Sequence, residues 1–338
     1  MKRDLLLKSA LGLLVLAALI GFFLKLFEEP KWQEIKSSSA KAELSSAKEE
    51  TKTESSKNGL FSFLKKSSEP INFLLLGASG SGYEAPDLTD TILVARFDEA
   101  KNKVFLFSLP RDLLVKIPDS ENFTKLNALY AYSKNEKNRE FENLKEKTKE
   151  ITGLKIQHYI LVDLNFVKKL VDLFGGVNIW VEKDILDTAF PGPNHSFETF
   201  ELKSGWRYLD GETALKFVRS RHSPSGDFDR ISRQQEILQA LKQKITNLKF
   251  WEFDKFLEIY QILAQNVKTD LNFLEIKDWW EKMKDIPGEN IVKTDVLGQN
   301  LFESGSAILG NTEASIVKPK AGVENYDEIK KFVEETIK

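Results

Sequence analysis

The first 70 residues confine any globular fold to the rest of the chain. Leu5 to Leu24 is almost wholly apolar, interrupted only by Lys8, and about 20 such residues are the length that spans a bilayer. Glu28 to Pro70 is rich in Ser, Lys, Glu and Ala and lacks the apolar content to fold alone. A hydrophobic core must therefore be built from Ile71 onward.

The apolar run predicts a membrane anchor. Lys2 and Arg3 precede it, which favours a cytoplasmic N-terminus and an exported body. No small-x-small cleavage site follows it, although a cleaved signal peptide remains the alternative. We expect residues 1–27 to form a cytoplasmic tip and transmembrane anchor, 28–70 a flexible stalk, and 71–338 an extracellular domain with a core at 71–248 and a C-terminal part at 249–338. The predicted location is the cell membrane, with a single pass.

Composition excludes several classes of function. The formal net charge of -2 argues against a general nucleic-acid binder. Because the chain has no cysteine, it has no disulfide framework, thiol nucleophile or Cys-ligated metal. Three histidines make a His-rich zinc site a poor hypothesis.

The pattern from Ile71 onward alternates between short apolar runs and segments with helical spacing. Strands are predicted at 71–76, 91–97, 103–109, 113–117, 158–162, 177–181, 291–296 and 314–317. Helices are predicted at 125–133, 141–151, 163–174, 210–218, from 229–232 to 248, and at 250–267, 273–283 and 326–337. This alternation indicates an α/β domain, a central β-sheet with helices on both faces.

Arginines gather in one window, Val218 to Gln235. The chain has 49 Lys and Arg residues, only nine of them Arg, and four of those nine lie here: Arg219, Arg221, Arg230 and Arg233. Arginine is favoured where a planar donor must grip a carboxylate or phosphate with two hydrogen bonds. The first two leave one predicted helix and the last two enter the next, whose N-terminus also favours anions. The window predicts a polyanion pocket; solvated helix ends with surface ion pairs are the alternative.

Two further stretches follow predicted strands. Gly77 to Gly82 is rich in glycine, but it matches neither a Walker A loop nor a convincing dinucleotide fingerprint, so a flexible turn and a ligand-lining loop both stay open. Arg111 lies at a strand end, where ligands of open α/β sheets usually bind. A structural salt bridge to Asp112 is the alternative for Arg111.

Six short blocks together resemble the LytR-CpsA-Psr family. They are Thr89-Asp90-Thr91, Pro110-Arg111-Asp112, Lys125-Leu126-Asn127-Ala128, Gly175-Gly176-Val177, Leu209 to Leu215, and Val218 to Gln235. They occur in the family's order and span about Ile71 to Leu248, with a weaker likeness at Ala314 to Ile337. The resemblance implies a mixed central sheet in an α-β-α sandwich behind a membrane anchor.

The resemblance also implies an activity. Members transfer a glycopolymer from a polyprenyl diphosphate carrier to the cell wall, usually to peptidoglycan, through a phosphodiester. The implied partners are that carrier, a wall acceptor and membrane lipid, without nucleic acid. The arginines that surround the diphosphate match Arg111, Arg219, Arg221, Arg230 and Arg233. The prenyl tail would occupy an apolar cavity between the sheet and its helices.

Three further side chains, Asp90, Asp227 and Gln234, are candidate site residues. Of two aspartates that hold Mg²⁺ in the family, the second matches Asp90. Asp227 could orient an arginine or act as a base, and we favour orientation. Gln234 could bind a phosphate oxygen or cap the helix.

One position departs from the family's pattern. Where many members carry the first metal aspartate, this chain has Ser79, and a neutral hydroxyl is a weaker Mg²⁺ ligand than a carboxylate. Glu84 or Asp87 could substitute, or the metal could bind only with substrate. Two other functions therefore stay open: hydrolysis of prenyl diphosphate, and a non-catalytic lipid-binding or regulatory role.

Overall fold

The computed structural model describes residues 69–80, 85–134, 139–191, 196–220, 227–248, 252–283 and 285–338. The predicted anchor and nearly all of the predicted stalk lie outside these residues. Among the helices within them, none combines the length and the apolar character needed to cross a membrane.

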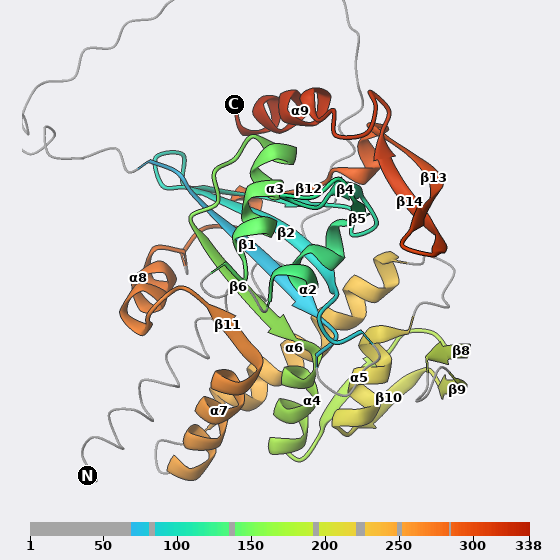
Figure 1. Cartoon of the computed structure of the whole chain (residues 1–338). Helices are drawn as coiled ribbons and strands as arrows, with labels where there is room; N and C mark the ends of the chain where they lie inside the picture. The colour runs from blue at the N-terminus through green and yellow to red at the C-terminus, as the bar shows by residue number, and fades with distance from the viewer. Residues whose placement is uncertain are drawn as a thin grey trace, which may run out of the picture.

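A six-stranded mixed sheet forms the centre of the domain (Figure 1). Its order is β11 (Val267–Thr269), β6 (His158–Asp163), β1 (Ile71–Ala78), β2 (Thr89–Asp98), β3 (Lys103–Ser108) and β12 (Ile291–Asp295). The pairs β1–β6 and β3–β12 are parallel and the other neighbours are antiparallel. The predicted mixed α/β class is confirmed.

Both faces of the sheet are buried. Along β1, Phe73 and Leu75 point into one hydrophobic cluster, while Leu74 and Leu76 point into the other. All four are at most 2% exposed, which explains why this strand reads as a continuous apolar run rather than an alternating one. Burial of each such side chain stabilises the fold by about 1.5–3 kcal/mol.

Helices supply the outer layers. On the face of Leu74 lie α2 (Leu129–Ser133), α3 (Glu142–Thr152) and α9 (Asp327–Ile337). On the face of Phe73 lie α4 (Leu164–Leu173), α5 (Gly211–Arg219), α6 (Asp227–Thr246), α7 (Phe253–Asn266) and α8 (Phe273–Met283). Trp279 of α8 packs edge-on against Phe73 and Phe97, so this tryptophan is a packing residue.

Four two-stranded ribbons surround this core. They are β4 (Leu114–Lys116) with β5 (Phe123–Lys125), β7 (Val177–Val181) with β10 (Gly205–Leu209), β8 (Ile185–Pro191) with β9 (Phe197–Leu202), and β13 (Phe302–Leu309) with β14 (Thr312–Pro319). Three short 3-10 turns complete the described elements: η2 (Leu126–Ala128), η3 (Gly288–Asn290) and η4 (Leu297–Gln299).

Several predicted boundaries are wrong. The helix predicted from Lys125 begins only with η2 and continues as α2, because Lys125 itself pairs with Leu114 in the β4–β5 ribbon. Phe190 and Pro191, which no predicted element contained, form the end of β8. The strands β5, β8, β9, β10, β11 and β13 were not predicted, since two-stranded ribbons and very short edge strands carry little periodicity of their own.

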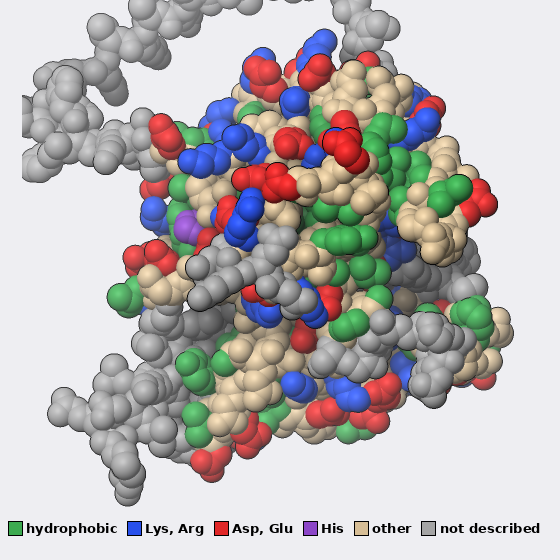
Figure 2. Space-filling view, in the orientation of Figure 1, with side chains coloured by type: hydrophobic (Ala, Val, Ile, Leu, Met, Phe, Trp, Pro, Cys, Tyr) green, Lys and Arg blue, Asp and Glu red, His purple; other side chains and the backbone are tan. Residues whose placement is uncertain are grey.

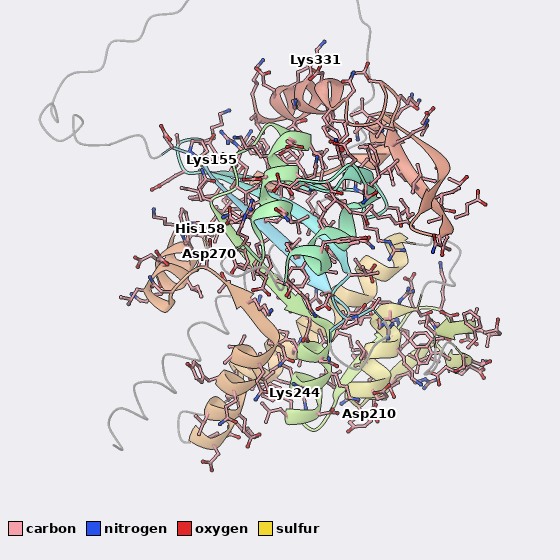
Figure 3. All side chains as sticks on the ribbon, in the orientation of Figure 1. Lys155, His158, Asp210, Lys244, Asp270 and Lys331 are labelled. Carbon is pink, nitrogen blue, oxygen red and sulfur yellow. The ribbon has the colours of Figure 1, made fainter. Side chains whose placement is uncertain are left out.

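Polar pairs fix the edges of the sheet. His158 Nδ1 lies 3.5 Å from Asp270 Oδ2, and Tyr159 N donates to Asp270 Oδ1 at 3.1 Å, which fastens the end of β11 to β6 (Figure 3). Elsewhere on the viewed face, Lys and Arg side chains are intermingled with Asp and Glu (Figure 2). The near-zero net charge is thus distributed, without one basic surface covering that face.

Candidate active site

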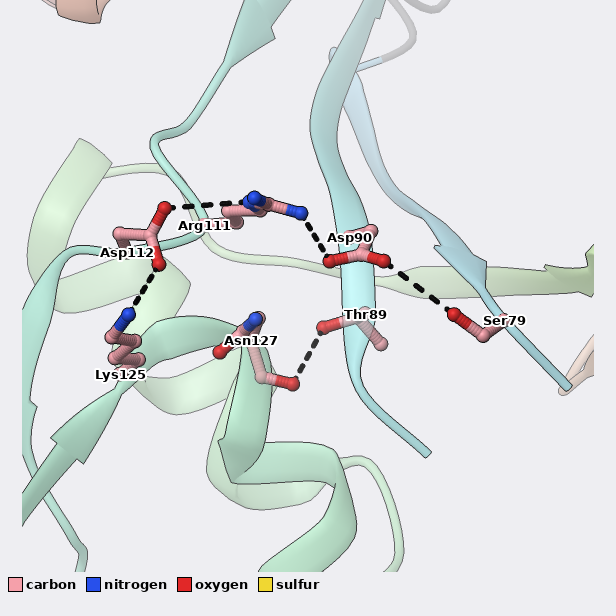
Figure 4. Close-up of polar contacts among 7 residues, drawn as sticks. All are labelled: Ser79, Thr89, Asp90, Arg111, Asp112, Lys125 and Asn127. Atoms are coloured by element: carbon pink, nitrogen blue, oxygen red, sulfur yellow. Dashed lines mark hydrogen bonds and ion pairs between the residues drawn. The ribbon is translucent and has the colours of Figure 1, made fainter. Parts of the chain in front are cut away.

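Ser79 and Asp90 meet where β1 ends and β2 begins. The register pairs Ala78 with Thr89 and is irregular between Gly77 and Ala78. Ser79 Oγ lies 3.5 Å from Asp90 Oδ2, at the long limit of a hydrogen bond (Figure 4). The two positions that the resemblance assigns to metal ligands are therefore neighbours across the strands.

Arg111 reaches the same carboxylate from the end of β3. Its Nη1 lies 2.6 Å from Asp90 Oδ1, and its Nε lies 3.3 Å from Asp112 Oδ2. The ion pair with Asp112, which was the alternative interpretation of Arg111, is thus present. Arg111 also makes a shorter contact with Asp90. The charged groups of Arg111 and Asp90 are about one-third exposed, so both are open to solvent.

Lys125 and Asp112 extend this group. Lys125 Nζ lies 2.7 Å from Asp112 Oδ1. Burial by itself raises the pKa of the Asp112 carboxyl, but the hydrogen bond from Lys125 and the charges of Lys125 and Arg111 outweigh it and lower that pKa. Sequence reasoning gave neither residue a site role; the available signal was their place inside two family blocks.

Backbone contacts hold these side chains in register. Asn127 N donates to the Arg111 carbonyl at 3.0 Å, and Thr89 Oγ1 donates to the Asn127 carbonyl at 3.2 Å (Figure 4). Thr89 and Asn127 are buried. These bonds connect β2, the segment that follows β3, and η2 at residues next to or identical with Asp90 and Arg111.

A third carboxylate lies at this edge of the sheet. Asp163 ends β6, pairs with Ala78 in the parallel register, and caps α4 by accepting from Phe166 N at 3.1 Å. Burial raises the pKa of Asp163 despite its backbone N–H donors. The sequence identified this residue only as a helix cap.

Gly80 allows the turn after β1 to pass over that cap. Its φ is +83°, and a Cβ built on it would lie 2.9 Å from Asp163 Cγ and from Asn165 Nδ2. Any side chain at this position would collide with the start of α4 and would also be strained. One glycine of the predicted glycine-rich turn therefore has a packing role.

The donors at this edge suit Mg²⁺ only in part. The described residues contain no group of three or more His, Cys, Asp or Glu placed to hold a metal ion. Asp90 offers one carboxylate and Ser79 a hydroxyl, while Asp87 is engaged by Lys134. Glu84 lies outside the described residues. This set fits an ion that draws its remaining ligands from water and substrate phosphates.

The first arginine of the window, Arg219, lies at the end of α5. Asp210 caps this helix by accepting from Thr213 N at 2.8 Å, and α5 ends at Arg219 (Figure 3). The Arg219 guanidinium lies 5.6 Å from the Phe190 ring centroid, within cation–π range. Arg221 lies outside the described residues.

Arg233 has an internal position. It is 6% exposed, donates from Nη2 to the Ser220 carbonyl, and lies 6.0 Å from the Phe217 ring centroid. This contact joins α6 to the turn that follows α5. The contact of Arg233 with the diphosphate stays a prediction. Its contact with Ser220 is a structural role that the sequence did not reveal.

Asp187 is a further residue that the sequence analysis missed. It lies on β8, is 2% exposed, and accepts from Ser220 Oγ at 3.0 Å and from Ala189 N at 3.2 Å. A buried carboxylate on β8 therefore holds the residue directly after Arg219. No local sequence signal distinguishes Asp187 from the exposed Asp184 three residues earlier.

The other predicted residues lie on α6. This helix begins at Asp227, slightly earlier than predicted, and includes Arg230 and Gln234, but the side chains of these three residues lie outside the described ones. On the described part of α6, burial and the charge of Glu182 raise the pKa of Glu236 to about 7, against the opposing charge of Arg233. Both β1 and β6 point toward the half of the molecule that carries α4, α5 and α6 (Figure 1).

Two known proteins are similar to this chain in sequence over about 60% of its length. A polyisoprenyl-teichoic acid–peptidoglycan teichoic acid transferase, TagU, from Enterococcus faecalis is 30% identical over 215 residues, covering 62% of this chain and 64% of that protein. The regulatory protein MsrR from Staphylococcus aureus is 31% identical over 208 residues, covering 61% of this chain and 58% of MsrR. The match thus spans less than two thirds of either relative.

The fold is found among solved structures as well. TagV of B. subtilis superposes with a TM-score of 0.50 at 23% identity, covering 79% of this chain and 96% of that one. At this identity the likeness speaks for the fold alone. The model of the LytR_cpsA_psr family matches residues 31–323, which is most of the chain, and the protein therefore belongs to the LytR_cpsA_psr family.

Proposed function

We propose that this protein is a membrane-anchored phosphotransferase that attaches a glycopolymer, carried on a polyprenyl diphosphate, to the cell wall. The observation that carries the proposal is the Asp90 carboxylate held between Ser79 and Arg111 at the end of β1. The name of the Enterococcus faecalis relative, a teichoic acid transferase acting on peptidoglycan, supports the same class of reaction.

The charges at the site suit a diphosphate together with a cation. Arg111 and Lys125 balance Asp90 and Asp112 in the free protein, so this cluster alone carries no excess positive charge. A diphosphate would draw Arg111 toward its oxygens, and Mg²⁺ bound at Asp90 and Ser79 would neutralise the charge that develops on the leaving phosphate. Arg219, Arg221, Arg230 and Arg233 are proposed to supply the remaining donors, with Gln234 beside them.

The proposed reaction needs no protein nucleophile. A hydroxyl of the wall acceptor attacks the phosphorus that bears the glycopolymer, the bond to the bridging oxygen breaks, and the polyprenyl monophosphate leaves. The acceptor's proton passes to a base or to water. Asp227 is proposed to orient an arginine, and its alternative role is that base.

The proposed place of the protein is the membrane surface. The apolar run Leu5 to Leu24 would anchor the chain, and residues 28–70 would hold the domain near the membrane surface, where a prenyl-linked substrate resides. The folded domain would then face the wall.

A second candidate is a non-catalytic lipid-binding or regulatory protein. Ser79 favours it, because this position lacks the carboxylate expected of a metal ligand. The regulatory name of the Staphylococcus aureus relative is in keeping with it. The two candidates differ in whether the bound diphosphate lipid is consumed.

One assay separates these functions. The full chain is incubated with a labelled polyprenyl diphosphate-linked glycan, Mg²⁺ and purified peptidoglycan. Label on the peptidoglycan supports transfer, label released without attachment indicates hydrolysis, and bound but unchanged lipid indicates the regulatory candidate.

Matched variants link the activity to the arginines. Arg219→Lys combined with Arg221→Lys keeps the charge but removes the bidentate donors, and transfer should fall about 10²-fold with little change in melting temperature. Arg139→Lys, at an exposed position ahead of α3, is the control and should transfer at the wild-type rate. Undiminished transfer by the double variant would remove the arginine window from the site.

A further inference from the structure

The outer face of the β7–β10 ribbon carries large aromatic side chains. Its inner face, with Val177, Ile179 and Val181, is buried in the core. The outer face consists of Asn178 and Trp180 on β7 and Trp206 and Tyr208 on β10, and we call these four residues the aromatic face. Trp180, Trp206 and Tyr208 are 53%, 67% and 63% exposed. The solvated side of such a ribbon is normally polar, and exposed aromatic groupings commonly mark binding surfaces.

The rings of the aromatic face are held in place by the protein itself. Trp180 and Trp206 are cross-strand partners, with ring centroids 5.9 Å apart and planes at 71°. Tyr208 donates from its hydroxyl to the Gly175 carbonyl at 2.9 Å, and its ring covers Gly176, where a Cβ would lie 2.4 Å away. Because these contacts exist before any ligand arrives, binding would cost little side-chain entropy.

Two cations beside the aromatic face, Lys203 and Arg207, contact other groups of the protein. Lys203 lies 2.6 Å from Glu201 and 3.3 Å from Asp184. Arg207 donates to the carbonyls of Lys203 and Ser204. Lys203 is neutralised by carboxylates, whereas Arg207 keeps its positive charge. One such cation falls short of the cluster of Lys and Arg residues that binds an anionic lipid surface, so these surroundings suit a neutral ligand.

We propose that the aromatic face binds an uncharged glycan chain. A pyranose ring presents a face of C–H groups that packs on the electron-rich face of an indole or phenol, while the Asn178 amide and the indole N–H groups can hydrogen-bond to sugar hydroxyl or N-acetyl groups. Tryptophan and tyrosine offer this combination of apolar face and polar edge, whereas the flanking charged residues do not. A stretch of sugar residues would lie along the ribbon.

The place of the ribbon suggests which glycan it holds, and this step rests on the proposed function. β10 runs through Asp210 directly into α5, which ends at Arg219 (Figure 1). A nine-residue helix is about 13 Å long, so one rigid element joins the aromatic face to Arg219. A wall glycan bound on the ribbon would be kept near the site as the acceptor.

The test is calorimetric titration of the full chain with a hexamer of N-acetylglucosamine. Trp180→Ala combined with Trp206→Ala should weaken binding at least about tenfold, because exposed aromatic anchors carry much of the energy of such contacts. The melting temperature should hardly change, since both rings are solvent-exposed. Tyr132→Ala removes an aromatic ring that is 55% exposed on α2 and serves as the control with unchanged binding.

Three results would overturn the inference. They are no binding of the hexamer by the wild type, equal binding by the double variant, and quenching by brominated phosphatidylglycerol vesicles that the double variant loses, since that quenching would place the rings in a bilayer. Affinity for the diphosphate lipid is measured separately and should survive in the double variant. A protein that binds the hexamer through these tryptophans but never binds the lipid would contradict the proposed function and leave the glycan site standing.

Discussion

Asp90 is the residue on which the candidate site depends most directly. Its two carboxylate oxygens face different partners: Oδ1 lies against Arg111 and Oδ2 against Ser79. A second carboxylate at position 79 would therefore lie beside Oδ2, with no cation between the two. Such a pair repels unless a metal ion enters.

Ser79→Asp should convert this position into a stronger metal site. We predict tighter Mg²⁺ binding by the free variant than by the wild type, because a second hard anionic oxygen would face the ion. Mg²⁺ should also raise the melting temperature of the variant more than that of the wild type. Ser79→Asn, similar in size but neutral, is the control, and adding Asp90→Asn to Ser79→Asp should cancel the gain. Equal Mg²⁺ affinities of wild type and Ser79→Asp would show that Ser79 is not at the metal position.

The titration of the Glu236 carboxyl makes the free energy of unfolding depend on pH. Its pKa in the folded protein is raised to about 7 from 4.5, so the folded state holds a proton that the unfolded chain has lost between these pH values. The stability that this group contributes is present below pH 4.5 and is lost as the pH rises through about 7. Glu236→Gln should flatten that part of the stability profile, measured by urea unfolding across the interval. A profile of unchanged slope in the variant would contradict the assignment.

At the scale of elements, Ser220, the residue that follows α5, is held from two sides. Asp187 of β8 accepts from the Ser220 hydroxyl, and Arg233 of α6 donates to the Ser220 carbonyl. Both bracing side chains are buried. The direction in which Arg219 leaves its helix is therefore set by two elements that lie apart from it in the chain.

Asp187→Asn should loosen the hold on Ser220. Replacing a buried, hydrogen-bonded carboxylate should lower the free energy of unfolding by about 2 kcal/mol. If this hold positions Arg219, affinity for the diphosphate lipid should fall as well, measured below the variant's unfolding transition. Asp184→Asn, at an exposed carboxylate of the same segment, should change stability by less than about 0.5 kcal/mol and leave affinity unchanged. Lost stability with unaltered lipid affinity would limit Asp187 to a structural role.

For the whole molecule, the hydrophobic core begins with β1. Both core clusters take their first members from this strand, and every described strand of the central sheet lies after residue 70. Glu69 and Pro70, the first described residues, are exposed or only half-buried. The core therefore draws none of its described packing from the predicted stalk.

Deleting residues 1–68 should leave a soluble domain that unfolds in one cooperative thermal transition. The removed part carries a predicted anchor and a polar segment, and the first described members of both core clusters lie on β1. The check is calorimetry on the truncated chain, compared with the detergent-solubilised full chain. Aggregation, or a broad transition without cooperativity, would move the domain boundary upstream of Ile71.

The sequence by itself determined the elements with strong periodicity. The continuous apolar run of β1, the amphipathic α4 and α9, and the stripe of Ile237, Leu241 and Ile245 on α6 were all predicted, because side chains near one another in the chain set these patterns. It also determined the family, since each matching block is a local string of residues. The concentration of arginine in one window was visible without any structure.

Only the tertiary structure decided which distant residues meet. The order and register of the sheet bring Ser79 beside Asp90 and Arg111, place Asp163 next to Ala78, and turn Arg233 inward onto Ser220. It likewise decided that two tryptophans 26 residues apart become cross-strand partners on an exposed face. Such contacts depend on strand pairing and on the packing of helices against the sheet, which are properties of the assembled core and leave no periodic signal in any one segment.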